Sequence, residues 1–320
     1  MATSDSIRSN LWHIAVLSGG DSPERVISLE SGAAVATALQ RRGHQVTRID
    51  PAEFDLTDYR WDDIDVAFLA LHGHFGEDGQ VQQILETAGI AYPGSDSAAS
   101  RLAFSKSASK ERFLQCGVPT PAYVLVHESD ASERIREQAK RIGFPLVVKP
   151  DGQGSSLGVS IVHSADELPD ALARCFYFDA FGILEAAVIG SEWTVGILDD
   201  VTLPPIQIET DRGFFDYAAK YEDEATRYLF DSAVPPDVKA TIEETGRRAC
   251  SSLGTQGLAR VDIMLDSANR PWTLEINTIP GLTSHSLIPK AAARVGMELG
   301  VLCERTIESC LKVAAERPQS

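Results

Sequence analysis

Residues 259–286 contain the feature that most constrains how this chain can fold. Two short segments, 260–265 and 272–277, alternate apolar and polar side chains in the manner of strands, and turn-forming residues separate them. A four-residue loop at 267–270 would fold one segment back on the other. The sequence therefore predicts an antiparallel hairpin in this region.

The register of this hairpin places polar side chains together. With that loop, Asp262 lies opposite Glu275 and Arg260 opposite Asn277, while Leu274 points to the other face. Two acids that face each other across a ladder repel unless a cation lies between them. Two carboxylates and an amide oxygen suit Mg²⁺ bound to a polyphosphate, so we favour a metal site over the alternative of a solvated polar face.

Composition excludes several classes of partner. The chain has 320 residues and a formal net charge of -17, which argues against binding to nucleic acid or to an anionic membrane. We interpret the acidity itself as favouring solubility. No apolar run reaches the roughly 18 residues of a membrane helix, and we expect a cytoplasmic protein. The five cysteines include no C-x-x-C pair and are interpreted as reduced thiols.

The N-terminal third has the pattern of a nucleotide-binding-like α/β domain. An apolar strand at 12–17 leads through a Gly-Gly turn into a helix that ends near Gly43, and further strands are expected at 45–49 and 65–71. The glycine spacing does not match a dinucleotide fingerprint. Glu24 stands at the start of the helix, where it either stabilises the helix dipole or binds a substrate.

The segment after the strand at 65–71 combines a histidine, three glycines and two acids. His72 follows the buried strand, and Glu77 and Asp78 precede an apolar-faced helix. Loops at the ends of parallel strands are where ligands bind, so we favour a site here over a purely structural histidine.

A second α/β segment follows a break near residue 105. A helix is expected at 100–116, and a buried strand ends at Lys149 directly before the Gly/Ser loop 152–158. The backbone N–H groups of such a loop can close over phosphates. It is not a Walker A loop, because the lysine precedes the glycines.

The C-terminal part adds two acidic strands and two long helices. Strands at 181–185 and 190–198 carry Glu185 and Glu192, and the loop 211–236 has the aromatic and charged composition of an ordered functional loop. The expected helices span 236–253 and 289–315.

Taken together, five motifs resemble the D-alanine:D-alanine ligase family over about residues 12–312. They are HGHFGEDG, KPDGQGSSLGVS, FFDYAAKY, RVDIML and EINTIPGLTSHSLIPKAA. Each alone is weak, but five in the family's order are specific. The resemblance implies an α/β fold, α+β in its ATP-grasp part, with an N-terminal Rossmann-like domain at 1–104, a central ATP-grasp subdomain at 105–188 and a C-terminal one at 189–320.

The resemblance also assigns roles to individual positions. The residues implied to hold ATP are Lys106, Lys149, Ser155, Ser156, Glu185 and Glu192. Two Mg²⁺ ions, or Mn²⁺ in their place, would be held by Asp262, Glu275 and Asn277. The residues implied to serve the two amino acids are Glu24, His72, Ser155, Lys220, Tyr221, Arg260, Gly281 and Ser286.

The implied activity is ATP-dependent joining of two D-alanines through a D-alanyl phosphate, for peptidoglycan synthesis. The implied partners are D-alanine and ATP, and the implied assembly is a homodimer. The alternatives are a ligase that joins D-alanine to D-lactate or D-serine, another ATP-grasp carboxylate–amine ligase, or a catalytically silent nucleotide-binding relative. In depsipeptide-forming members a histidine replaces the loop tyrosine, and residues 211–236 contain no histidine. The loop therefore favours the dipeptide.

Overall fold

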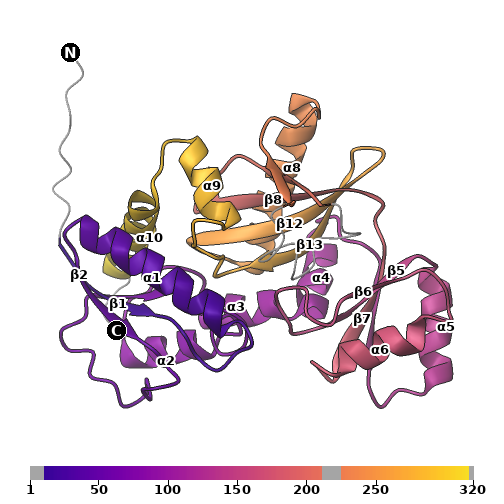
Figure 1. Cartoon of the computed structure of the whole chain (residues 1–320), viewed down its shortest axis with the longest axis horizontal. Helices are drawn as coiled ribbons and strands as arrows, with labels where there is room; N and C mark the ends of the chain where they lie inside the picture. The colour runs from indigo at the N-terminus through magenta and orange to yellow at the C-terminus, as the bar shows by residue number, and fades with distance from the viewer. Residues whose placement is uncertain (1–10, 211–224, 317–320) are drawn as a thin grey trace.

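The described part of the chain forms three β-sheets with helices packed around them. A computed structural model describes residues 11–210 and 225–316. Figure 1 shows the N-terminal sheet at the left, a central sheet at the right and a larger sheet above and between them. Among the described residues, no helix combines the length and apolarity needed to cross a membrane.

The N-terminal sheet is parallel and buried on both faces. Its strand order is β2-β1-β3, from β1 (His13–Leu17), β2 (Gln45–Ile49) and β3 (Val66–Leu69). Alternate apolar residues face α1 (Arg25–Arg41) and α10 (Leu299–Glu316) on one side and α2 (Gln80–Ala88) on the other. Because parallel strands are connected by covering helices, these continuous apolar runs are what such a sheet requires. The predicted strands of this region are confirmed.

The central sheet is antiparallel and has the order β4-β7-β5-β6. Its strands are β4 (Tyr123–His127), β5 (Leu146–Pro150), β6 (Ser160–Val162) and β7 (Phe181–Ala186). Leu146, Val148 and Leu184 pack against α5 (Ser132–Ile142) and α6 (Leu168–Phe176). Strand alternation therefore turns Val147, Lys149 and Glu185 toward the opposite face.

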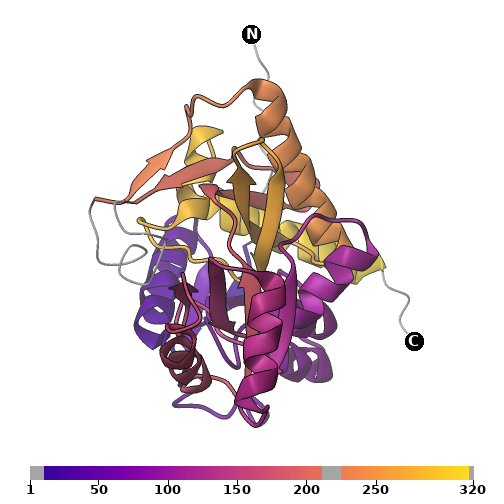
Figure 2. The ribbon, with the colours of Figure 1, turned by 90° about the vertical axis from the view of Figure 1, so that its right-hand side faces the viewer.

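In the residues that the structure describes, the C-terminal sheet has six strands, all paired antiparallel. The order is β11-β10-β8-β12-β13, with β9 beside β8, from β8 (Gly190–Leu198), β9 (Val201–Thr202), β10 (Ile206–Glu209), β11 (Arg227–Leu229), β12 (Leu258–Asp266) and β13 (Pro271–Asn277). Helix α8 (Pro236–Leu253) runs along one face and closes an apolar core there (Figure 2). The expected helix at 236–253 is confirmed.

Two helices expected to be continuous are each broken in two. The helix expected at 100–116 divides into α3 (Ser97–Phe104) and α4 (Lys106–Gln115), because Ser105 has extended backbone angles and its hydroxyl caps α4 through Ala108 N–H. The helix expected at 289–315 divides into α9 (Leu287–Arg294) and α10, and Gly296 between them has a φ of 75°.

The β12–β13 hairpin has the predicted pairing at the site but not at its turn. Arg260 pairs with Asn277 and Asp262 with Glu275, as expected. Beyond this point the register shifts by one residue, so that Leu265 pairs with Pro271, although residues 267–270 connect the two strands as expected. Leu274 is the unpaired bulge residue, and it lines the same cavity as Glu275, which corrects its predicted placement on the opposite face.

Each of the three sheets lies within one of the three predicted domains. Helix α10, however, packs on α1 and shares the core of the N-terminal sheet through Leu302 and Ile307. The end of the chain therefore packs with its beginning. The division at 104 and 188 stays a prediction, although the break at Ser105 coincides with the first of these boundaries.

Candidate active site

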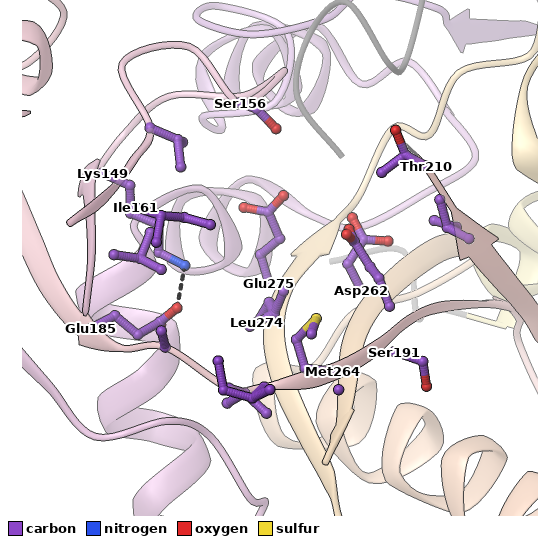
Figure 3. A pocket seen from close by; sticks show the side chains of 18 of the residues that line it. Lys149, Ser156, Ile161, Glu185, Ser191, Thr210, Asp262, Met264, Leu274 and Glu275 are labelled. Atoms are coloured by element: carbon purple, nitrogen blue, oxygen red, sulfur yellow. Dashed lines mark hydrogen bonds and ion pairs between the residues drawn. The ribbon is translucent and has the colours of Figure 1, made fainter. Parts of the chain in front are cut away.

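A cavity of about 690 Å³ lies between the central and C-terminal sheets. Figure 3 shows its labelled side chains converging from both sheets. The predicted residues that line it are Lys106, Lys149, Ser156, Glu185, Glu192, Asp262 and Glu275. Its apolar wall is formed by Val147, Ile161, Ala187, Met264 and Leu274. An apolar slot that ends in lysines and carboxylates suits a flat base joined to a charged polyphosphate.

Lys149 and Glu185 form an ion pair in the wall of this cavity. Lys149 Nζ donates to Glu185 Oε1 at 2.7 Å, from neighbouring strands of the central sheet (Figure 3). Burial opposes ionisation of Glu185, but the ammonium groups of Lys110 and Lys149 outweigh it and hold its pKa below the ordinary value. The pair is therefore charged and fixed in position.

The Gly/Ser loop at 152–158 approaches the cavity in a strained conformation. Ser155 and Ser156 have φ angles of 50° and 57°, in the left-handed region that non-glycine residues rarely adopt. Lys106 Nζ donates to the carbonyl of Gln153 in the same loop. Strain of this kind persists where the surroundings hold it and often accompanies ligand-binding loops.

A second, smaller cavity of about 70 Å³ lies beside the first. The predicted residues that line it are Glu24, His72, Ser155, Arg260, Asn277, Gly281 and Ser286. Ser155 Oγ donates a hydrogen bond to Glu24 Oε1, which joins the Gly/Ser loop to the start of α1. Glu24 makes no capping hydrogen bond to α1, and its side chain lines the small cavity.

Glycine at position 73 makes room for this carboxylate. Gly73 has a φ of 70°, and a Cβ there would lie 2.6 Å from Glu24 Oε2. Any larger residue would displace the carboxylate or strain the loop. The first glycine of the HGHFGEDG motif thus leaves the space that the Glu24 carboxylate occupies.

Burial shifts the pKa values of two groups in this cavity in opposite directions. Burial, with the nearby positive charge of Arg260, lowers the pKa of His72 to about 4, so the imidazole is neutral at physiological pH. Burial and the Glu24 carboxylate raise the pKa of Glu77, whose Oε2 accepts from Gly73 N–H at 2.7 Å. The cavity therefore contains a neutral imidazole beside closely spaced carboxyl groups.

The carboxylates of the hairpin are held by cationic and polar neighbours. Arg260 donates to both oxygens of Asp262, at 2.9 and 2.8 Å, and Thr194 Oγ1 donates to Oδ1 at 2.7 Å. Asn277 Nδ2 lies 3.2 Å from Asp262 Oδ2, and Lys106 Nζ lies 3.4 Å from Glu275.

The donor chemistry of this face fits Mg²⁺. No group of three or more His, Cys, Asp or Glu side chains in the described parts of the chain is arranged to hold a metal. Asp262, Glu275 and Asn277 instead offer two carboxylates and an amide oxygen, and Mg²⁺ is commonly held by one or two carboxylates with phosphate and water oxygens.

The far end of the small cavity suits a carboxylate. Ser286 is the residue before the first turn of α9, and its hydroxyl lies 3.1 Å from Thr283 N and 2.9 Å from Thr283 Oγ1. The N-terminus of a helix attracts anions through its free N–H groups and dipole. Lys220, which was predicted for this end, and Tyr221, which was predicted to hydrogen-bond with Glu24, lie outside the described residues.

The sequence did not indicate a specific role for three residues at the site. Glu77 lines the small cavity, Thr194 supports Asp262, and Lys110 makes an ion pair with Glu185. Lys110 stands four positions after Lys106 in one helix, a spacing that puts both on one face and could have indicated it. Thr194 belongs to a different strand from Asp262, and no local pattern connects the two.

The central and C-terminal sheets are antiparallel and face each other across a nucleotide-sized cavity, on which lysines and acids converge. This arrangement defines an ATP-binding ligase of the ATP-grasp class. Family models for the D-ala D-ala ligase N-terminus and C-terminus match residues 51–95 and 113–308. The chain belongs to the D-alanine–D-alanine ligase family, ATP-dependent enzymes that make D-alanyl-D-alanine for peptidoglycan.

Individual relatives agree with this assignment over almost the whole chain. A D-alanine–D-alanine ligase of Methylacidiphilum infernorum is 41% identical over 298 residues, which cover 92% of this chain and 94% of the relative. The ATP-complexed crystal structure of the Bacillus anthracis D-alanine–D-alanine ligase is 32% identical, with a TM-score of 0.84 over 95% of this chain and 99% of that one. A D-Ala:D-Ser ligase from Enterococcus faecalis is 26% identical, with a TM-score of 0.82 over 93% and 99%.

Proposed function

We propose that the two cavities bind ATP and two D-alanines and that their contents react at the β12–β13 hairpin. This proposal rests on one observation: two neighbouring residue pairs of the same hairpin line different cavities. Asp262 and Glu275, which pair with each other, line the large cavity, whereas Arg260 and Asn277, the next pair on the same face, line the small one. The terminal phosphate of ATP and a substrate carboxylate would meet on this face.

ATP occupies the large cavity in this proposal, and its phosphates extend toward the hairpin. Lys106 and Lys149 place positive charge beside the phosphates, and the Gly/Ser loop with Ser155 and Ser156 closes over them. Glu185 and Glu192 accept hydrogen bonds from the nucleoside. Two Mg²⁺ ions, or Mn²⁺, would be held by Asp262, Glu275 and Asn277 and would offset the charge of the triphosphate.

The first D-alanine binds in the small cavity. Its ammonium pairs with Glu24, beside neutral His72, and its carboxylate is directed toward the hairpin. Ser155 holds Glu24 in position, and we expect Tyr221 to join this hydrogen-bonded group when the site closes.

Activation of the first D-alanine precedes formation of the amide bond. A carboxylate is a poor acyl donor, so one of its oxygens attacks the γ-phosphorus of ATP, the bond to the bridging oxygen breaks, and ADP leaves. The product is D-alanyl phosphate. Lys106 and Lys149 offset the charge that gathers on the transferred group.

The second D-alanine then attacks the activated carbonyl. Lys220 and the N-terminus of α9 at Ser286 bind its carboxylate, and its amine, after losing a proton, adds to the carbonyl carbon. Arg260 and the Gly281 N–H donate to the oxyanion, a contribution of roughly 10²–10³-fold per donor. The carbon–oxygen bond to phosphate then breaks, and the dipeptide is complete.

ADP release with ATP, Mg²⁺ and single candidate acceptors tests this function against its alternatives. D-Alanine alone should support release and give D-alanyl-D-alanine. Higher release with D-alanine plus D-lactate or D-serine would favour those specificities, and release with an unrelated carboxylate–amine pair would favour another ligase. Absence of release with every pair would favour a catalytically silent relative.

We also propose a cytoplasmic homodimer, because the family resemblance suggests it and ATP is the phosphoryl donor. Light scattering coupled to gel filtration tests the assembly, and a mass twice that of one chain is expected.

A further inference from the structure

Lys110 is a fully buried lysine in the wall of the proposed nucleotide site. Its side chain has no exposed surface, and it does not line either cavity. Its ammonium makes an ion pair with Glu185 Oε2, donates to Thr120 Oγ1 at 2.7 Å, and lies 5.8 Å from the ring centre of Tyr123. A buried ammonium group is stable only with ion-pair and hydrogen-bond partners such as these.

Glu185 is paired with two ammonium groups, one at each oxygen. Lys149 contacts Oε1 from the cavity side, and Lys110 contacts Oε2 from the interior. The Lys110–Glu185–Lys149 trio therefore has a net charge of about +1, whereas Lys149 and Glu185 alone would cancel. Because electrostatic interactions act strongly where water is excluded, this residual charge favours a phosphate beside Lys149.

Lys110 also connects the two sheets that enclose the cavity. Thr120 Oγ1 accepts from Lys110 and donates to the carbonyl of Thr273 in β13 at 2.8 Å. Thr273 lies two residues before Glu275, and its N–H donates to the carbonyl of Pro119. The chain of contacts thus runs from Glu185 in the central sheet to the strand that carries Glu275.

We propose that Lys110 is a positioning residue for nucleotide binding: it neutralises Glu185 from behind, so that the charge of Lys149 remains available to the phosphates of ATP. This inference rests on the proposed nucleotide site. Burial lowers the pKa of Lys110 to about 8, so the ammonium form still predominates at pH 7. A neutral residue at this position would leave Glu185 to pair with Lys149 alone.

The test is direct binding of ADP and ATP, together with KM values, in Lys110→Met and Lys110→Arg variants. Lys110→Met should weaken nucleotide binding roughly tenfold to a hundredfold and leave the KM for D-alanine within about twofold. Lys110→Arg retains the charge and should bind nucleotide more tightly than Lys110→Met. Lys140→Met, which removes an exposed lysine of α5, is the matched control for net charge and should behave as wild type.

A double variant separates charge from folding. Lys110→Met with Glu185→Gln restores the net charge of about +1 and removes the unpaired buried acid. Measured against Glu185→Gln alone, the additional Lys110→Met change should have a small effect on ADP binding, and the double variant should bind ADP more tightly than Lys110→Met. The comparison with Glu185→Gln alone remains available if Lys110→Met does not fold.

Three results would overturn the inference. They are unchanged nucleotide binding in folded Lys110→Met, an equal rise in both KM values, and a Lys110→Met effect that is the same in the wild-type and Glu185→Gln backgrounds. The proposed function fails separately: it is contradicted if the wild-type protein binds neither ADP nor ATP. Because direct binding of ADP and ATP requires no turnover, it tests the role of Lys110 whichever amino acids the enzyme joins.

Discussion

Ser155 and Glu24 are joined by a hydrogen bond from the serine hydroxyl to the carboxylate, although 131 positions separate them in the chain. This contact brings the strained Gly/Ser loop of the central sheet to the first helix of the N-terminal sheet. It therefore couples the proposed cover of the phosphates to the proposed binding site of the first D-alanine. Closure of the Gly/Ser loop over the phosphates would therefore affect binding at the D-alanine site.

Replacing Glu24 by Gln keeps the size of the side chain and removes its charge. We expect the KM for the first D-alanine to rise roughly tenfold to a hundredfold, since a hydrogen bond to a charged group contributes about 1.5–3 kcal/mol. The KM for ATP should change much less. Steady-state kinetics at varied D-alanine and ATP check this. A lower melting temperature with unchanged kinetics would show that Glu24 serves only the helix end, a role worth about 0.3–1 kcal/mol.

Replacing Glu275 by Gln should reduce kcat by roughly a hundredfold or more while the fold remains intact, because it removes negative charge from the proposed Mg²⁺ site. Turnover at saturating Mg²⁺ and circular dichroism are the measurements. Asp200→Asn, at an exposed acid in the turn between β8 and β9, is the matched control. Near-native turnover of folded Glu275→Gln would exclude this residue from the metal site.

His72 should make the stability of the protein depend on pH between about 6.5 and 4. Its pKa is depressed in the folded state from 6.5 to about 4, so the unfolded chain binds more protons in this interval. The full contribution is present above pH 6.5 and is lost as the pH falls toward 4, up to about 3 kcal/mol of unfolding free energy.

Chemical denaturation of wild type and His72→Gln across this range measures the effect. The variant should show a shallower loss of stability on acidification. Glu77, whose raised pKa acts with the opposite sign, is present in both proteins and cancels in the comparison. Parallel curves for the two proteins would contradict the buried, neutral state of His72.

The second substrate should be D-alanine and not D-lactate at neutral pH. The proposed acceptor loop contains Tyr221 and no histidine, so it lacks the side chain whose protonation near pH 7 would disfavour an incoming ammonium. Competition at pH 7 between equal concentrations of D-alanine and D-lactate, with products resolved by mass, checks this. Predominance of the ester would mean that Tyr221 does not set the choice.

The hairpin shows both the reach and the limit of prediction from sequence. Alternation placed Arg260, Asp262, Glu275 and Asn277 on one face correctly, because polar residues on short strands show which side faces a ligand. The register shift and its bulge at Leu274 were missed. The pairing at the site was therefore predicted correctly, while Leu274 was placed on the wrong face.

Other differences arise where tertiary contacts decide local structure. Residues 97–116 have helical propensity throughout, yet Ser105 turns out of the helix and donates to Asp151 at 2.7 Å, at the start of the Gly/Ser loop. Lys110 reads as a solvent-facing lysine in sequence, and its burial depends on Glu185 and Thr120 from distant segments. Such pairings carry no local periodicity, so only the folded structure reveals them.

The central claim is that the D-alanine carboxylate is activated by phosphoryl transfer before the peptide bond forms. The most direct measurement uses D-alanine labelled with oxygen-18 in its carboxylate, with mass analysis of the inorganic phosphate that is released. The attacking carboxylate oxygen stays with phosphorus when the acyl–oxygen bond breaks, so we predict one labelled oxygen in each phosphate and D-alanyl-D-alanine as product. Unlabelled phosphate released together with the dipeptide would contradict the account.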